Sequence, residues 1–260
     1  MSCTYNIEPN LRVIVTAGAA GIGRAIAEAF DEIGAKIHVC DIAQPALDSC
    51  KADHPDWGYT LCDVSDEQQV AQLFAQAEEH LGGLDVLINN AGIAGPTASV
   101  EDMKPSDWDA TIAINLNSQF YCAHHAVPLL KRSDRASIIC ISSIAGRLAY
   151  ANRTPYAATK WAIRGLTESL AMELGSEGIR VNCIMPGIVE GPRIDAVIEA
   201  RADKEGVSFE QMSANYKNMA SLERMVTAQD VAQQVLYFCS PLAKNISGQA
   251  ISVDGHVRAL

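Results

Sequence analysis

Short apolar runs alternate with longer segments of helical period, and this alternation constrains the fold more than any other feature of the chain. The runs are apolar at consecutive positions, which is typical of strands buried on both faces of a sheet. Between them, apolar residues recur three and four positions apart, as from Ile22 to Ile33 and from Val70 to Ala77. Alternating strands and helices predict a parallel sheet covered by helices on both faces, an α/β fold. The apolar runs are Val13–Val15, Ile37–Val39, Val86–Ile88, Ile138–Ile141 and Val181–Ile184.

The 260 residues read as one domain over 1–260, because no proline- or serine-rich linker divides the chain. Helices are predicted over about 105–131, 155–174 and 227–238. Between Gly187 and Ser221 the pattern turns irregular and polar, with Pro192 and Gly206 inside it. Such a long excursion is usually functional, so we expect a substrate lid at about 187–221.

The net charge of −11 argues against nucleic acid or an anionic membrane as a partner, because both need clustered Lys and Arg. No basic stretch followed by an apolar run stands at the start, and no window is apolar enough to span a membrane. We therefore expect a cytoplasmic protein. The eight cysteines lack a Cys-x-x-Cys pair and are expected to be reduced and mostly buried. The six histidines lack metal-binding spacing, so no metal is expected.

A glycine-rich turn, Thr16–Gly23, follows the first apolar run directly and opens the first predicted helix. This is the context of a dinucleotide fingerprint, in which glycines let the backbone approach a pyrophosphate at the positive end of a helix. The alternative is a tight strand-to-helix turn with nothing bound.

Asp41 ends the second apolar run, 18 residues after Gly23, close to the offset of about 20 expected for an acidic residue that binds ribose hydroxyls. A carboxylate there repels a 2′-phosphate, and no Lys or Arg occupies the turn or immediately follows Asp41. NAD is therefore favoured over NADP. The alternative is that Asp41 caps the next helix.

Tyr156 and Lys160 are four residues apart in a predicted helix, so both side chains can lean into one cleft. A neighbouring positive charge favours the phenolate, which makes the tyrosine a usable proton acceptor near neutral pH. Ser142 and Ser143 lie upstream, at the end of a predicted strand. Taken singly, each of these residues is more often structural than catalytic.

These motifs, in this order, resemble the short-chain dehydrogenase/reductase family along nearly the entire chain. The resemblance implies a single Rossmann-type, doubly wound parallel sheet of about seven strands. It also implies a catalytic tetrad, in which Asn115 holds a water that relays protons. The resemblance places the catalytic serine thirteen residues before the tyrosine, at Ser143, and leaves Ser142 as a supporting hydroxyl. The tetrad is Asn115, Ser143, Tyr156 and Lys160.

The same resemblance implies a set of cofactor-binding residues that follow successive strands. Two positions depart from the family pattern: Ala17 replaces the first glycine of the turn, and Gly191 stands near a common threonine. The backbone of Ile188 is expected to contact the nicotinamide amide. The implied residues are Gly18, Ala20, Gly21, Ile22, Gly23, Asp41, Ile42, Asp63, Val64, Asn90, Ala91, Gly92, Tyr156, Lys160, Pro186, Gly187 and Ile188.

Two arginines are candidates for substrate recognition beside Ser143 and Tyr156. Arg153 precedes the catalytic helix, and Arg193 lies just inside the lid. A guanidinium suits a carboxylate, sulfonate or phosphate, so we hypothesise a small anionic hydroxy compound or ketone. The alternative is a solvated arginine or a surface ion pair. The sequence names neither the substrate nor its stereochemistry.

The family resemblance implies a homotetramer, formed through the two long helices and the C-terminal strand within residues 246–255. An exposed apolar stripe on the catalytic helix, made of Trp161, Ile163, Leu166 and Leu170, would serve such an interface. Alternatively, these four residues pack only against their own sheet.

The leading hypothesis is an NAD-dependent dehydrogenase that interconverts a secondary alcohol and a ketone, mainly by oxidation. One alternative is an NADP-linked reductase of the ketoacyl type, which the lack of basic residues near the turn disfavours. Another is a dinucleotide-binding scaffold without catalysis.

Overall fold

The computed structural model describes residues 5–260, with all side chains except those of Arg193, Ala200 and Lys204. Seven parallel strands form one sheet in the order β3-β2-β1-β4-β5-β6-β7. The predicted parallel α/β sheet is therefore confirmed. The strands are β1 (Arg12–Thr16), β2 (Lys36–Asp41), β3 (Gly58–Leu61), β4 (Val86–Asn89), β5 (Ser137–Ile141), β6 (Arg180–Pro186) and β7 (Ala250–Val253).

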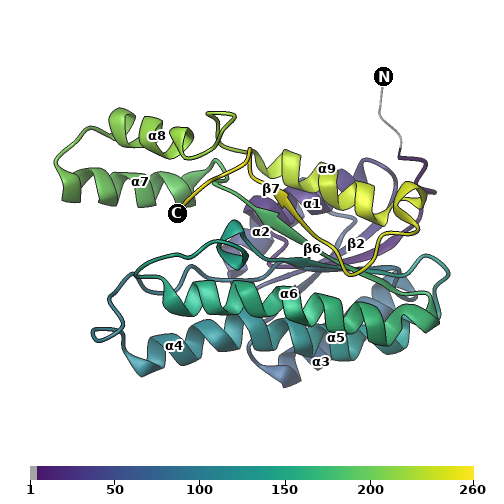
Figure 1. Cartoon of the computed structure of the whole chain (residues 1–260). Coiled ribbons are helices and arrows are strands. Elements are labelled where there is room, and N and C mark those ends of the chain that lie inside the picture. The colour runs from purple at the N-terminus through teal and green to yellow at the C-terminus, as the bar shows by residue number, and fades with distance from the viewer. Residues whose placement is uncertain (1–4) are drawn as a thin grey trace.

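Helices cover both faces of the sheet (Figure 1). One face carries α1 (Gly21–Asp31), α2 (Gln44–Asp53) and α9 (Ala228–Cys239). The other face carries α3 (Glu67–Leu81), α4 (Pro105–Ile112), α5 (Ser118–Leu130) and α6 (Thr154–Leu174). Two further helices, α7 (Pro192–Glu205) and α8 (Phe209–Asn218), project from one end of the molecule.

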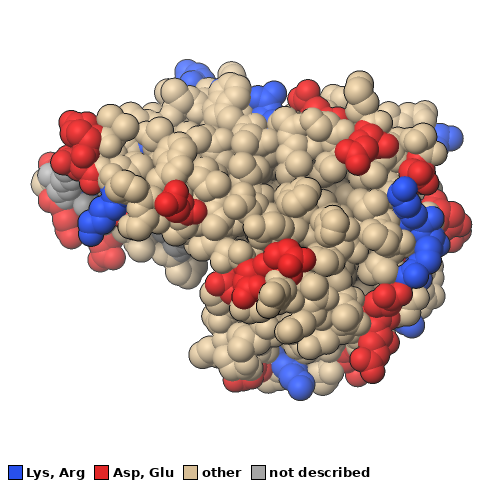
Figure 2. Space-filling model, turned by 90° about the horizontal axis from the view of Figure 1, so that it is seen from below, with Lys and Arg blue, Asp and Glu red and all other residues tan. Residues whose placement is uncertain are grey.

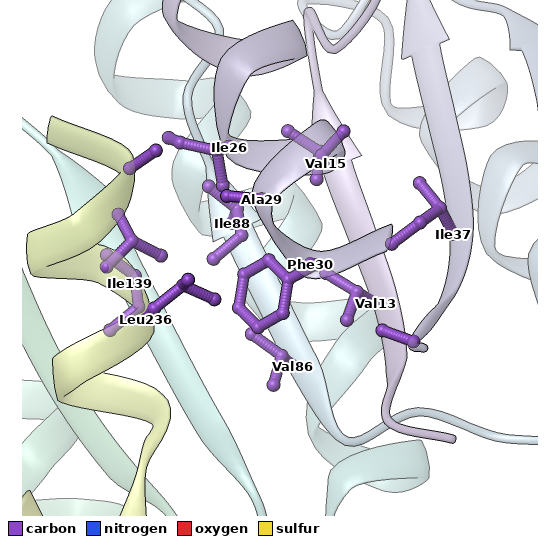
Figure 3. Close-up of a cluster of buried hydrophobic side chains, with 14 of the residues drawn as sticks. Val13, Val15, Ile26, Ala29, Phe30, Ile37, Val86, Ile88, Ile139 and Leu236 are labelled. Atoms are coloured by element: carbon purple, nitrogen blue, oxygen red, sulfur yellow. The ribbon is translucent and has the colours of Figure 1, made fainter. Parts of the chain in front are cut away.

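The strand residues alternate between two apolar cores, one on each face. In β1, Val13 and Val15 belong to the core under α1 and α9, whereas Ile14 belongs to the core above α3 and α5. Figure 3 shows Phe30 of α1 among Val13, Val86 and Leu236, so one aromatic ring joins two strands and two helices. Burial on both faces explains why the strands read as continuous apolar runs.

The strand order reverses between β1 and β4, because the chain builds the sheet outward from β1 in both directions. In a parallel sheet of this kind, ligands bind outside the carboxyl ends of the strands at the point of reversal. The glycine-rich turn follows β1 at this edge, and the segment Asn90–Gly92 follows β4. The topology therefore gathers the candidate residues at one edge of the sheet.

The predicted helix over 105–131 is continuous in space but not uniform. A π-helical turn, Ala113–Asn117, joins α4 to α5. A π turn inserts an extra residue into the helical ladder and is frequent at functional sites. Here the turn carries Asn115, whose side chain is fully buried.

The prediction of an irregular polar lid was wrong in its secondary structure, because α7 and α8 account for most of 187–221. Helix α7 ends at Gly206, whose φ of 68° is left-handed, and Ser208 begins α8 by accepting a hydrogen bond from the Gln211 N–H at 3.2 Å. The two helices bury a small core of their own that includes Ile198 and Tyr216. The segment expected to be the lid is thus largely a packed helical pair.

The predicted apolar stripe on α6 was wrong for Ile163, which is fully buried against the sheet, and Leu170 packs against the same core. Trp161 is 48% exposed, and Phe120 of α5 and Met172 of α6 are also exposed. Figure 2 shows a broad uncharged area on the face seen from below, with scattered charges and no continuous basic patch. Within residues 5–260, no helix has the length and apolar character needed to cross a membrane.

Candidate active site

The glycine-rich turn presents the N-terminus of α1 without a side-chain cap. The N-cap residue is Ala20, and the first intrahelical bond runs from the Arg24 N–H to the Ala20 carbonyl at 3.1 Å. The amides of Gly21, Ile22 and Gly23 therefore precede the helical ladder. Uncapped amides at the positive end of a helix suit a pyrophosphate, so this part of the chain is suited to a dinucleotide.

Two glycines of the turn are required by close backbone packing. A Cβ on Gly18 would lie 2.8 Å from the Val15 carbonyl oxygen and equally close to Val39. A Cβ on Gly23 would lie 2.2 Å from the Ala17 carbonyl oxygen. Gly21 has a φ of 54° and open space around it. Ala17 itself has a φ of 48°, a left-handed conformation that glycine adopts more readily.

Asn90 supports the turn with its side chain. Its Nδ2 donates to the carbonyls of Thr16 at 2.9 Å and Ala17 at 3.1 Å. The hydroxyl of Thr16 in turn accepts from the backbone N–H groups of Asn90 and Ala91, both at 3.0 Å. Asn90 therefore fixes the turn to the end of β4, and Thr16 is a partner that the sequence analysis did not single out.

The ends of β2 and β3 place two carboxylates at the same edge. Asp41 Oδ1 accepts from the N–H of Ala43, the N-cap residue of α2, at 3.1 Å, so it stabilises the turn before α2 without capping the first turn of that helix. Among the described side chains, no ion pair involves Asp41. Ile42 is 66% exposed beside it. Asp63 Oδ1 accepts from the backbone and hydroxyl of Ser65, and Val64 is buried.

Pro186 ends β6, and Gly187 follows it where two backbone segments meet. A Cβ on Gly187 would lie 2.7 Å from the Asp254 Cα. The carbonyl of Ile188 accepts from the Val226 N–H at 2.9 Å, and the Ile188 side chain packs in the lid core. The segment is thus held between β7 and the lid.

Tyr156 and Lys160 lie on one face of α6, as their spacing predicts. Lys160 Nζ is 5.6 Å from the centre of the Tyr156 ring and donates to the Ile141 carbonyl at 3.0 Å. The lysine is 4% exposed.

The two serines after β5 differ in their contacts. Ser142 Oγ donates to the Lys160 carbonyl at 2.7 Å, so its hydroxyl proton is not available to a substrate. Ser143 Oγ accepts from the Ala145 N–H at 3.1 Å and begins a short 3₁₀ turn, Ile144–Gly146. The hydroxyl proton of Ser143 can therefore point to a substrate oxygen, which supports the choice of Ser143.

Asn115 joins the π turn to the segment after β4. Its Oδ1 accepts from the Ile93 N–H at 2.7 Å, and its Nδ2 donates to the Ile93 carbonyl at 3.0 Å and to Thr159 Oγ1 at 3.2 Å. A Cβ on Gly92 would lie 3.2 Å from Asn115 Oδ1 and 3.5 Å from Lys160 Nζ. Gly92 thus lies between these two tetrad members, and Thr159 is a further partner that the sequence reading missed.

Arg153 lies directly beside the candidate base. Its guanidinium carbon is 5.5 Å from the centre of the Tyr156 ring and 5.3 Å from that of Tyr150. It donates to the Ala94 carbonyl at 2.9 Å and to Thr97 Oγ1 at 3.2 Å, while its Nε is buried with no partner among the described residues. Arg193 falls within α7, but its side chain lies outside the described residues.

Two buried cysteines near Lys160, Cys140 and Cys183, are not nucleophiles at neutral pH. Burial raises the pKa of the Cys183 thiol to about 11 and that of the Cys140 thiol to about 12, against a partial lowering by Lys160. Among the described residues, no group of three or more His, Cys, Asp and Glu side chains is arranged to hold a metal ion. A cavity of about 670 Å³ beside Arg135 and Arg180 lies at the opposite end of the sheet.

Residues 17–257 match the family profile described as enoyl-(acyl carrier protein) reductase. The (+)-borneol dehydrogenase 1 of Salvia officinalis is 37% identical, with 93% of this chain and 91% of the relative covered. The D-beta-hydroxybutyrate dehydrogenase of Cupriavidus necator is 34% identical, with 93% and 95% covered. The ligand-free aldohexose dehydrogenase of Thermoplasma acidophilum superimposes with a TM-score of 0.88 at 30% identity, with 96% of both chains covered.

These matches extend over nearly the whole chain, and the solved structure agrees with the seven-stranded parallel sheet. The chain belongs to the short-chain dehydrogenase/reductase family of nicotinamide-dependent oxidoreductases.

Proposed function

We propose that this protein interconverts a secondary alcohol and a ketone, mainly by oxidation, with NAD as the cofactor. The observation that carries the proposal is the placement of two cations, Lys160 and Arg153, within 5.6 Å of the centre of the Tyr156 ring at the carboxyl edge of the sheet. A phenol in this environment is suited to accept a proton. Two relatives are named as dehydrogenases of borneol and of hydroxybutyrate, which supports an alcohol or ketone substrate.

In the oxidative direction, Tyr156 takes the proton of the substrate hydroxyl as general base. Ser143 donates a hydrogen bond to the same oxygen as that atom becomes a carbonyl, which stabilises the charge that develops there. Lys160 places its positive charge beside the Tyr156 ring, and Asn115 holds a water that carries protons onward to solvent. The bound nicotinamide dinucleotide supplies the hydride acceptor.

The residues that would hold the dinucleotide follow from the edge they share. The amides at the start of α1 would bind the pyrophosphate, and Asp41 would bind ribose hydroxyls. Asp63 and the exposed Ile42 would hold the adenine end, while the Pro186–Ile188 segment and Lys160 would hold the nicotinamide end. NAD is favoured because Asp41 would repel a 2′-phosphate and no described basic side chain pairs with it.

We further propose that the substrate carries an anion that Arg153 binds. The guanidinium is fixed by Ala94 and Thr97 beside Tyr156, and its Nε has no protein partner in the described part of the chain. The rest of the guanidinium is only partly buried, and a carboxylate, sulfonate or phosphate would pair with its open side. The D-beta-hydroxybutyrate named for one relative is an anion of this kind.

For the assembly, we propose a homotetramer in the cytoplasm. Phe120, Trp161 and Met172 are exposed on α5 and α6, where a second copy could cover them. Native mass spectrometry at micromolar protein tests this, and a spectrum of monomer alone would refute it.

Absorbance of NADH over a panel of neutral alcohols and hydroxy acids tests the proposed reaction. We expect NAD-dependent turnover on at least one secondary alcohol, faster than with NADP. Arg153→Ala should raise KM for acidic substrates while sparing neutral ones. Equal loss on both classes would rule out the anion, whereas no turnover on any compound, with NADH still bound, would favour a scaffold.

A further inference from the structure

Two buried arginine–aspartate pairs lie at opposite edges of the sheet. Arg12 Nη2 is 2.6 Å from Asp85 Oδ1 at the amino edge, and Arg147 Nη2 is 2.6 Å from Asp254 Oδ2 at the carboxyl edge. The aspartate side chains are 1% and 7% exposed, and the arginines 26% and 30%. Desolvation of the two aspartates offsets part of the attraction in both pairs.

Arg147 ends the short turn that begins at the catalytic serine. Ser143 is the N-cap of the 3₁₀ turn, and the Arg147 N–H closes it on the Ile144 carbonyl at 2.9 Å. The Arg147 side chain then crosses to the C-terminal segment, where Nε donates to Ser252 Oγ at 3.0 Å and Nη2 to the Val257 carbonyl at 3.1 Å. The serine turn is therefore tied to residues more than 100 positions away in sequence.

Asp254, the partner of Arg147, packs on the segment proposed to hold the nicotinamide. A side chain on Gly187 would meet the Asp254 Cα at 2.7 Å, and the Gly187 N–H donates to the Val253 carbonyl at 2.9 Å. Little space separates the two backbones. A shift of Asp254 must therefore move Gly187.

The residues after Asp254 hold the end of the lid. The N–H groups of Ser221 and Leu222 donate to the carbonyls of His256 and Gly255, both at 3.1 Å. Ala220 and Val257 also form an antiparallel bridge. Figure 1 shows the C-terminus beside the lid helices. The C-terminal segment is thus bonded to the lid on one side and to Arg147 on the other.

We propose that Arg147 is a positioning residue. Its contacts with Asp254, Ser252 and Val257 hold three segments in fixed positions relative to one another: the catalytic serine turn, the Gly187 segment and the lid. The inference rests on the proposed dehydrogenase reaction. A reaction can slow by about 100-fold when a reacting group is displaced by about 1 Å. Arg147 touches none of the tetrad side chains in the contacts of the described residues and acts through the backbone it fixes.

Arg147→Met tests this against the matched variant Arg12→Met. Both remove an arginine that lies 2.6 Å from a buried aspartate and has similar exposure, so both should lower Tm, although Asp85 keeps Arg135 at 3.5 Å. We expect Arg147→Met to lower kcat per folded molecule by about tenfold or more. Arg12→Met should retain the wild-type kcat. Arg147→Lys keeps the charge but cannot reach all three acceptors at once, so it should recover part of the rate.

Hydrogen exchange gives a readout that does not need turnover. Arg147→Met should speed exchange in residues 143–148, 186–190 and 219–222, whereas Arg12→Met should not. If the two variants lose Tm alike while kcat and exchange in these segments match wild type, Arg147 is only structural and the proposal is wrong. Asp254→Asn replaces Arg147→Met if the latter does not fold. If the wild-type protein shows no turnover, the proposed reaction is wrong. Hydrogen exchange then still tests whether Arg147 connects the three segments.

Discussion

Lys160 Nζ lies 5.6 Å from the centre of the Tyr156 ring, while its own hydrogen bond to the Ile141 carbonyl ties the base of the catalytic helix to the end of β5. The ammonium is therefore fixed relative to the phenol by the sheet as well as by the helix. A base positioned by two elements needs little rearrangement before it accepts a proton.

Tyr156→Phe should lower kcat/KM by a factor on the order of 10²–10⁴, because it removes the proton acceptor and leaves the ring in place. NADH binding by fluorescence and Tm should stay near wild type. Tyr237→Phe, on α9 at the other face of the sheet, is the matched control and should keep full turnover. A Tyr156→Phe protein that turns over normally would contradict the assignment.

Asp41→Ala should weaken the preference for NAD over NADP by roughly tenfold or more, because it removes a charged hydrogen-bond acceptor at the ribose and the repulsion of a 2′-phosphate. The measurement is kcat/KM for each cofactor. Asp48→Ala removes a nearby exposed carboxylate of α2 and should leave the ratio unchanged. An unchanged ratio in Asp41→Ala would mean that the carboxylate serves only the turn at Ala43.

Most strands could be predicted from the sequence, because a strand buried on both faces is apolar at consecutive positions. The order of the site residues could be predicted from their motifs. Strand β3 (Gly58–Leu61) gave no such signal. It is a short edge strand, and Gly58 has no side chain because His38 and His80 fill the space where a Cβ would lie. Helices α7 and α8 were missed because their few apolar residues pack mainly against each other.

Within the site, spacing along one helix placed Tyr156 and Lys160, and motif order placed the glycine-rich turn. Contacts between segments far apart in the chain could not be predicted from a single sequence. Arg147 and Asp254 are 107 residues apart, and Asn115 reaches Ile93 only because a π turn redirects it. Such pairings depend on the packed fold and not on local pattern.

Gly23→Ala should abolish NADH binding or weaken it strongly, because the added methyl would lie 2.2 Å from the Ala17 carbonyl and 2.6 Å from Asn90 Nδ2. Relief requires the turn to open, which moves the amides that face the pyrophosphate. Calorimetry with NADH measures the effect. Gly165→Ala is the control, since no atom lies within 4 Å of its added methyl and alanine favours the helix. Equal NADH affinity in both variants would contradict the role of the turn.

Ala17→Gly should raise the free energy of unfolding by up to about 1 kcal/mol, because residue 17 has a φ of 48° and glycine has no Cβ to strain there. The greater freedom of glycine in the unfolded chain offsets part of the gain. Urea denaturation of the apoprotein measures the difference. A variant less stable than wild type would show that Ala17 is not strained.

His38 should make the protein less stable in mild acid. It is 2% exposed on β2, and its Nε2 is paired with Thr60 Oγ1 at 2.9 Å. Burial, with a smaller effect of His80, lowers the pKa of His38 to about 4 from an ordinary 6.5. Between these values the unfolded chain binds the proton and the folded chain does not, so acid favours unfolding.

The loss of stability should therefore begin as the pH falls through about 6.5, reach about 3 kcal/mol near pH 4, and then level off for this group. His38→Asn removes the titrating group, so its difference in unfolding free energy from wild type should shrink by that amount over the same window. His124→Asn removes an exposed imidazole on α5 and should follow the wild-type curve. Urea denaturation at a series of pH values measures all three proteins. Parallel curves for wild type and His38→Asn would show that the buried imidazole does not titrate with unfolding.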